Sequence, residues 1–244
     1  MKTSTFNTLV IISSVVIGWV IFEFMLPQFI KDGGPLVISL IALAIMLIAV
    51  ITERLLTLKK ANGRGTMTLF LKNVQQAVNA GDIDTAITAC DKQRGSCANI
   101  LRAGLERYKT VVEEGDVKGQ KELMESIQRS IEEATMLEIP MLEKNLSMMS
   151  TIASIGTMVG LLGTVIGMIR SFAAMARAGA PDAVQLALGI SEALINTAGG
   201  LVAGIGGIVA YNFFTTKIDN FTYMIDEASY SIVQSLASRK PHRK

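Results

Sequence analysis

Charged side chains are scarce in this chain of 244 residues: Asp, Glu, Lys and Arg make up 18% of it, against roughly a quarter in ordinary soluble domains. The shortage is uneven, because residues 33–52, 146–169 and 183–216 contain a single acidic or basic side chain between them, Glu192. Apolar stretches of about 18 or more residues are typical of membrane-spanning helices. The composition therefore excludes a soluble globular enzyme and predicts a polytopic membrane protein.

Histidine and cysteine are almost absent. The single histidine, His242, lies within the last three residues of the sequence, which leaves no histidine-based catalytic triad and no histidine-containing metal site before the tail. Cys90 and Cys97 are spaced more widely than the pair of a zinc knuckle, so we interpret both as structural thiols. The net charge of +2, without a basic stripe interleaved with aromatic residues, gives no sign of nucleic acid binding. We predict no metal, no cofactor, no enzymatic activity and no nucleic acid partner.

The N-terminal segment, residues 1–32, is hydrophobic but differs from a cleaved signal peptide. Its basic start is weak, and it lacks a small-x-small cleavage motif. We predict that it is retained, either as an extra span or as an amphipathic helix in the outer interface, which Glu23 would tolerate. Basic residues follow the apolar run 36–51, and by the positive-inside rule they place the C-terminal end of this run in the cytoplasm. Basic residues in the C-terminal tail of the chain place the tail on the same side. These cations are Arg54, Lys59, Lys60 and Arg64 behind the run, and Arg239, Lys240, Arg243 and Lys244 in the tail.

The polar region between residues 55 and 145 has apolar residues at helical spacing and no sustained strand-like alternation. Gly81-Asp82, Gly95-Ser96 and Gly115-Asp116 each offer a helix stop followed by a cap. This pattern predicts a solvated helical bundle whose last helix continues into the next span, with a kink near Pro140. A helix over residues 183–216 would be ~51 Å long, more than the ~30 Å hydrocarbon core, so it should project into the cytoplasm.

The predicted fold is therefore all-α, with three core transmembrane helices, a probable additional N-terminal hydrophobic helix, and long helices that extend into a cytoplasmic helical domain. The predicted segments are an N-terminal hydrophobic segment at 1–32, a first core span at 33–54, a cytoplasmic helical domain at 55–145, a second core span at 146–170, a periplasmic loop at 171–182, a third core span at 183–216, and a cytoplasmic C-terminal helix with a basic tail at 217–244.

Glycines recur at helical spacing in the last two predicted spans. In lipid there is no hydrophobic gain from pressing two helices together, so tight packing depends on small residues that let the backbones approach. The two glycine faces predict close helix–helix contacts and, because so few spans make a thin bundle, a homo-oligomer. The glycines of these faces are Gly156, Gly160, Gly163 and Gly167 in one span, and Gly200 and Gly204 in the other.

Glu192 is the residue of the spans that most needs an explanation. A carboxylate within an apolar helix costs at least ~2.5 kcal/mol on insertion scales, so it usually faces a polar lumen or a partner. The alternative is that Glu192 reaches the outer interface. Threonine hydroxyls in membrane helices often only bond back to the carbonyl four residues earlier, but together with Glu192 they would line a hydrated path for a small ion. The candidate residues of this path are Thr157, Thr164, Glu192, Asn196 and Thr197.

Two sequence motifs resemble a known family. Gly-Leu-Leu-Gly-Thr-Val-Ile-Gly-Met at 160–168, followed by Ser171-Phe172, and Gly-Ile-Ser-Glu-Ala-Leu-Ile-Asn-Thr-Ala at 189–198 are similar to the paired motifs of the MotA/TolQ/ExbB proton channel family, most of all its ExbB branch. The resemblance implies a homopentamer in the lipid of the bacterial inner membrane, around a pore that holds the helices of a dimeric single-span partner such as ExbD, TolR or MotB. That partner would supply the aspartate that takes up and releases the proton. In the ExbB branch, the resulting motion drives TonB, which opens outer-membrane transporters.

Carried over by position, the resemblance implies that Thr164 and Thr197 face the pore and that Glu192 is the family's acid in the last span. Three features depart from the family pattern: Gly156-Thr157 stands where relatives commonly have Ala-Pro, Asn196 replaces a small apolar residue, and the N-terminal segment is additional. The extra polar groups leave proton and sodium both open as the ion. A TolQ-like subunit that maintains the envelope is the close alternative, a MotA-like flagellar stator fits less well, and a non-conducting scaffold is the alternative from another class.

Overall fold

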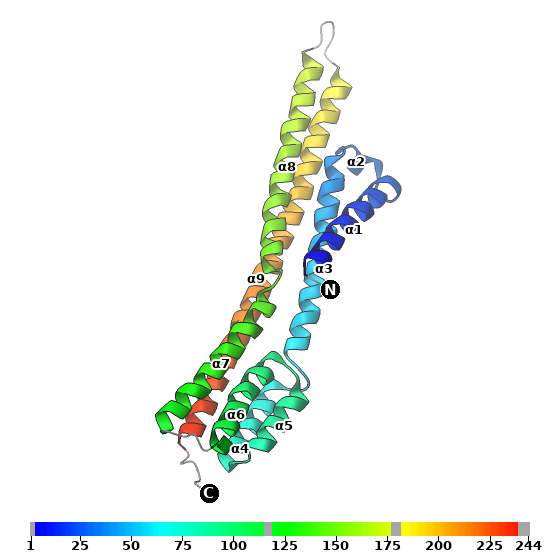
Figure 1. Cartoon of the computed structure of the whole chain (residues 1–244). Coiled ribbons are helices and arrows are strands. Elements are labelled where there is room, and N and C mark those ends of the chain that lie inside the picture. Colours follow the sequence, from blue (N-terminus) through cyan, green and yellow to red (C-terminus); the bar gives the residue numbers. More distant parts are fainter. Residues whose placement is uncertain (1–2, 115–118, 177–181, 239–244) are drawn as a thin grey trace. The chain divides into compact units, whose positions relative to one another are not determined.

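The computed structural model describes residues 3–114, 119–176 and 182–238 (Figure 1). Every regular element in these ranges is a helix, which confirms the predicted all-α fold. The predicted turn at Gly115-Asp116, residues 177–181 of the predicted periplasmic loop, and the basic tail with His242 lie outside the described residues. The helices are α1 (Thr3–Phe24), α2 (Gln28–Lys31), α3 (Leu36–Ala61), α4 (Met67–Ala80), α5 (Ile83–Gln93), α6 (Ser96–Glu114), α7 (Gln120–Glu143), α8 (Leu146–Met175) and α9 (Ala183–Ala237).

The chain divides into two compact units, which are described separately. The first, called the membrane unit below, consists of Met1–Arg54 and Asn145–Phe214. The second, called the polar unit, consists of Leu55–Lys144 and Thr215–Lys244. Helices α3 and α9 contribute residues to both.

Three helical stretches of the described chain are long and apolar enough to cross a membrane, namely Leu36–Ala61, Gln120–Met175 and Ala183–Ala237. The apolar helix Thr8–Phe24 is shorter. It packs against α3 at Gly18, where an added Cβ would lie 3.2 Å from the Ala42 nitrogen. Whether α1 spans the membrane or lies in its interface stays a prediction.

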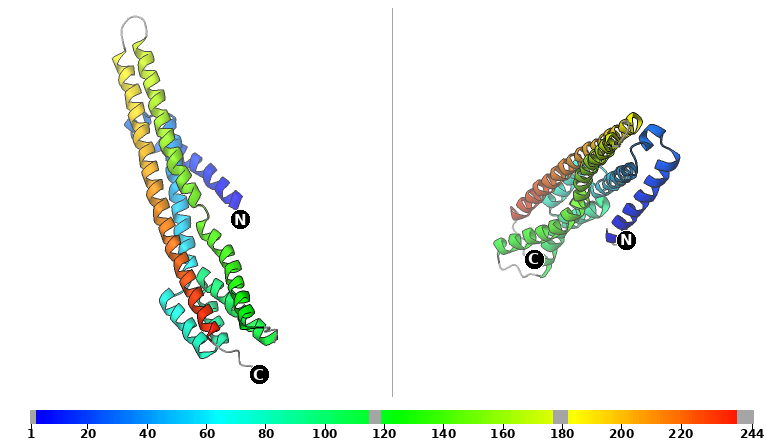
Figure 2. Two further views of the ribbon diagram at one scale, coloured as in Figure 1. Left: turned by 90° about the vertical axis from the view of Figure 1, so that its left-hand side faces the viewer. Right: turned by 90° about the horizontal axis from the view of Figure 1, so that it is seen from above.

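Helices α8 and α9 run side by side through the membrane unit (Figures 1 and 2). α8 continues to Met175, five residues into the segment predicted as a loop at 171–182. It continues because its last turns pack on α9: Ser171 is buried, and its hydroxyl donates to the Leu186 carbonyl at 3.1 Å. α9 begins after Asp182, whose carboxylate accepts from the Val184 and Gln185 amides at 3.1 Å. It then runs without a break past residue 216, where a segment boundary was predicted.

The junction between α7 and α8 lies a few residues beyond the predicted kink. Pro140 is inside α7, which ends at Glu143, and the Lys144 amide still donates to the Pro140 carbonyl. The chain turns at Asn145, which adopts a left-handed conformation with φ of 63°. Asparagine tolerates this region better than most residues, so Asn145 and not Pro140 interrupts the helix.

The polar unit has the helix boundaries that its glycines predict. Gly81 ends α4 in the left-handed region with φ of 86°, and Asp82 caps α5 by accepting the Thr85 amide at 2.9 Å. α6 begins at Ser96, directly after Gly95. The core is made of large apolar side chains at three- and four-residue spacing, as the sequence pattern predicts. Its fully buried members include Val74, Val78, Ile100, Leu101, Leu105 and Ile127.

Candidate functional site

Helices α8 and α9 meet along a seam of glycines in the membrane unit. All four predicted glycines of α8 are buried on this seam. A Cβ added to Gly160 would lie 2.9 Å from the Gly200 Cα, and one added to Gly167 would lie 2.8 Å from the Ala193 nitrogen. Such separations leave no room for any side chain, so the two backbones are in direct contact. The close helix contact predicted from Gly156, Gly160, Gly163, Gly167, Gly200 and Gly204 is thus formed within one chain.

Glu192 lies near the start of α9, where its side chain is buried and paired with a cation. Its side chain is 7% exposed, and Arg170 Nη1 donates to both carboxylate oxygens, at 2.6 and 2.5 Å. Gly34, with φ of 75°, lies against the carboxylate: a Cβ there would be 2.7 Å from Glu192 Oε1. The pair offsets the cost of burying the carboxylate. The alternative that Glu192 reaches out to an interface does not match this burial.

Arg170 is the residue of this polar group that the sequence analysis did not single out. It is the last residue of the predicted span 146–170 and follows directly after the uncharged run 146–169. The antiparallel glycine contacts set Gly167 opposite Gly189 and Ala193, and helical side chains lean toward the N-terminus of their own helix. Arg170 thus reaches back to the level of Glu192. If the two predicted spans are paired as antiparallel helices in this register, Arg170 is the cation that lies level with Glu192.

Asn196 connects the start of the first core span to α9. It is completely buried, and its Nδ2 donates to the Gly33 carbonyl at 2.7 Å and to the Glu192 carbonyl at 2.9 Å. Its Oδ1 is buried without a hydrogen-bond partner. Gly163 supplies the space for this side chain, because any Cβ at that position would collide with Asn196. Burying a hydrogen-bond acceptor without a partner costs free energy. Asn196 is thus a costly polar residue within the otherwise apolar contact between α8 and α9.

The three candidate threonines bond to their own helices. Thr157 donates to Ala153 at 3.0 Å, and Thr164 donates to Leu161 at 2.6 Å. Thr197 donates to Ala193 at 3.2 Å, with a longer contact of 3.5 Å to the Gly160 carbonyl across the seam. Each hydroxyl oxygen can still accept a hydrogen bond. The structure thus joins Arg170, Glu192 and Asn196 by hydrogen bonds, whereas none in the described residues joins the hydroxyl of Thr157, Thr164 or Thr197 to this group.

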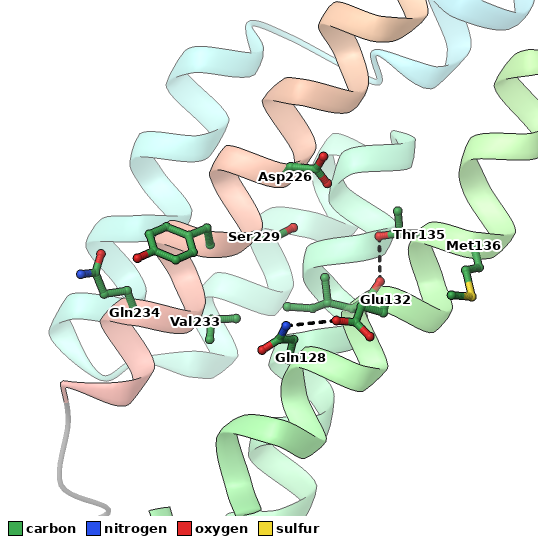
Figure 3. A pocket seen from close by; sticks show the side chains of 10 residues that line it. Gln128, Glu132, Thr135, Met136, Asp226, Ser229, Val233 and Gln234 are labelled. Carbon is green, nitrogen blue, oxygen red and sulfur yellow. Dashed lines mark hydrogen bonds between the residues drawn. The ribbon is translucent and has the colours of Figure 1, made fainter. Parts of the chain in front are cut away.

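A cavity and both cysteines lie in the polar unit, outside the glycine seam. A cavity of about 590 Å³ lies between α7 and α9 in the polar unit, lined by Glu132, Asp226 and Tyr230 among others (Figure 3). Within the part of the chain that the structure describes, no group of three or more His, Cys, Asp or Glu residues is placed to hold a metal. Cys90 and Cys97 are free and buried, and burial raises the pKa of each thiol to about 12. Such thiols are unreactive at neutral pH, in agreement with a structural role.

Comparison with known proteins assigns the hairpin to a family. The sequence model of the MotA/TolQ/ExbB proton channel family matches residues 92–227, which is more than half of the chain and contains both motifs and the glycine seam. A search of curated proteins finds no matching sequence. The family consists of proton channels and is not a known enzyme class, and three helices long enough to span a membrane agree with a multi-pass membrane protein. The chain belongs to the MotA/TolQ/ExbB proton channel family.

Proposed function

We propose that this chain is an ExbB-like stator subunit that forms the ring of a proton channel. With an ExbD-like partner, it would convert the proton motive force into mechanical work on a TonB-like protein for nutrient import through the outer membrane. The observation that carries the proposal is the α8–α9 hairpin, in which the backbones are in contact along glycines and Glu192, Asn196 and Thr197 lie within two turns of α9 beside this contact. This hairpin lies inside the segment that matches the family.

The assembly that we propose is a homopentamer in the bacterial inner membrane. Because the glycines are used within one chain, the outward faces of α8 and α9 supply the surface for neighbouring copies and lipid. These faces carry large exposed apolar side chains, which suit both kinds of contact. Examples are Met158, Leu161, Val165 and Ile169 on α8, and Val202 and Val209 on α9.

The proton-binding carboxylate would belong to the partner. Glu192 is the single acid of the apolar runs 33–52, 146–169 and 183–216, and Arg170 donates to both of its carboxylate oxygens. A group that carries a proton must release its partners to accept it. Thr164 and Thr197 would line the path, since a hydroxyl that donates to its own helix can still accept a hydrogen bond from an ordered water.

A non-conducting scaffold is the second candidate, because the local bonding of all three threonine hydroxyls is also what a scaffold would have. A TolQ-like subunit for envelope maintenance would use the same hairpin. The experiment is uptake of an iron chelate in a strain that lacks the gene, complemented with wild type or Thr197→Val. A conducting stator should lose uptake about tenfold or more in the variant, because the change removes a part-buried hydroxyl from the proposed path.

The matched control is Thr110→Val, which removes a hydroxyl that donates to Glu106 at 2.9 Å in the polar unit. It should leave uptake unchanged at equal membrane levels. Normal uptake in Thr197→Val would favour the scaffold. Normal uptake without the gene would direct the test to envelope integrity, as for a TolQ-like subunit, and then to motility.

A further inference from the structure

The Arg170–Glu192 pair has an asymmetry that bears on what Glu192 does. The Glu192 side chain is 7% exposed, whereas the Arg170 side chain is 55% exposed. Arg170 uses one nitrogen, Nη1, for both carboxylate oxygens. The arginine thus has open surface around it, whereas the glutamate is enclosed and has Arg170 as its hydrogen-bonding partner. Breaking a buried pair costs most when the charge that stays buried is left alone.

The groups around the carboxylate provide no replacement for Arg170. Asn196 Nδ2 is committed to the Gly33 and Glu192 carbonyls and not to the carboxylate. Gly34 approaches Glu192 with backbone alone. Lys31, the nearest cation in sequence to this turn, donates to the Glu23 carbonyl at 2.6 Å. Within the described residues, Arg170 is thus the one side chain that hydrogen-bonds to the Glu192 carboxylate.

We propose that Arg170 is a positioning residue that pairs with the buried Glu192 carboxylate and locks the α8–α9 hairpin, so that Glu192 has a structural part in the stator and carries no ion itself; this rests on the proposed function. The pair joins the end of α8 to α9 and to the Gly33–Gly34 turn before α3. Asn196 and Thr197 follow Glu192 by about one helical turn. An unpaired carboxylate at Glu192 would therefore disturb their placement.

This structural assignment predicts an unusual order of damage among the amide variants. Arg170→Gln leaves a carboxylate buried and unpaired, so iron-chelate uptake should fall about tenfold or more at equal membrane levels. Glu192→Gln and the double variant Arg170→Gln/Glu192→Gln bury no unpaired charge and should stay within about threefold of wild type. Arg170→Lys retains the cation and should rescue most of the activity lost in Arg170→Gln.

If Glu192 carried the ion itself, removing its carboxylate would abolish uptake whether or not Arg170 is present. If Glu192→Gln and the double variant lose uptake as completely as Arg170→Gln, the carboxylate itself is required and the proposal is wrong. Arg129→Gln, which removes the exposed Arg129–Glu133 pair, is the matched control and should behave as wild type.

Thermal unfolding of the detergent-purified full chain separates this inference from the proposed function. Arg170→Gln should lower the Tm more than the double variant does, because the second change removes the unpaired charge. Additive Tm changes would refute the pairing. If the wild type itself fails to support uptake, the proposed function is wrong, and the unfolding series still decides the pair.

Discussion

The two halves of α9 bury residues at the same spacing but of opposite size. In the membrane unit the buried positions hold small residues, apart from the polar Asn196 and Glu192 and from Phe214 at the unit's last residue, and in the polar unit they hold mostly large ones. The small set comprises Gly189, Ala193, Gly200, Ala203, Gly204 and Gly207, and the large set comprises Ile218, Phe221, Ile225, Ile232 and Leu236, with Ala228 among them. Both follow steps of three and four residues, so periodicity alone does not separate them.

The difference in size follows from the surroundings that each half is built for. In water, burying a large apolar side chain contributes ~1.5–3 kcal/mol, so large residues stabilise the polar unit. In lipid this gain is absent, and contact between backbones becomes the source of packing energy. The buried face of α9 is thus stabilised by large apolar side chains in the polar unit and by close backbone contact at small residues in the membrane unit.

The largest effect should come from adding bulk to the glycine seam. Gly160→Leu would place its Cβ 2.9 Å from the Gly200 Cα, where backbone and not a flexible side chain must move. We expect α8 and α9 to separate, with loss of the native oligomer in native mass spectrometry and loss of uptake. Ala80→Leu, which adds the same side chain at an exposed position of α4 in the polar unit, is the control. An unchanged oligomer in Gly160→Leu would contradict the direct backbone contact.

The sequence could predict the spacing of the buried residues in these two regions of α9. The glycine faces, the helix stops at Gly81 and Gly95, and the all-α fold follow from local pattern. The partner of each glycine did not follow, because it depends on the register between helices. Gly163, for example, is needed to make room for Asn196, which no pattern within α8 indicates.

Buried charges were the least predictable part. Arg54 was expected to serve as a cytoplasmic charge, yet it is 1% exposed and bonds both oxygens of Glu53 at 2.6 and 2.7 Å. Arg170 pairs with Glu192 across 22 residues of sequence. Both pairs depend on tertiary burial, which composition and local spacing do not encode.

A smaller effect, opposite in direction, should come from removing bulk in the polar unit. Leu101→Ala deletes a fully buried side chain and should destabilise the unit by ~2–5 kcal/mol through lost burial and a cavity. The neighbouring thiol reports it: burial raises the pKa of Cys97 to about 12, so alkylation at pH 8 should be slow in the wild type and faster in the variant. Leu69→Ala, at a position 59% exposed, should leave the alkylation rate unchanged. Equal rates in all three proteins would refute the role of Leu101 in the core.

The smallest effect concerns how the two units treat a carboxylate. Glu192 needs a counter-ion, whereas Asp82 is exposed at the start of α5 and is stabilised by the Thr85 hydroxyl and amide, which lower the pKa of its carboxyl group. A lowered pKa in the folded state means that the ionised cap contributes stability above the unfolded-state pKa of about 4, and that this contribution is lost as pH falls through the folded-state pKa. Asp82→Asn retains a capping oxygen without the charge. The stability difference between wild type and Asp82→Asn should therefore shrink below pH 4, measured by urea unfolding of the full chain in detergent, and a difference that stays constant from pH 7 to pH 3 would show that the charge of Asp82 contributes nothing to the cap.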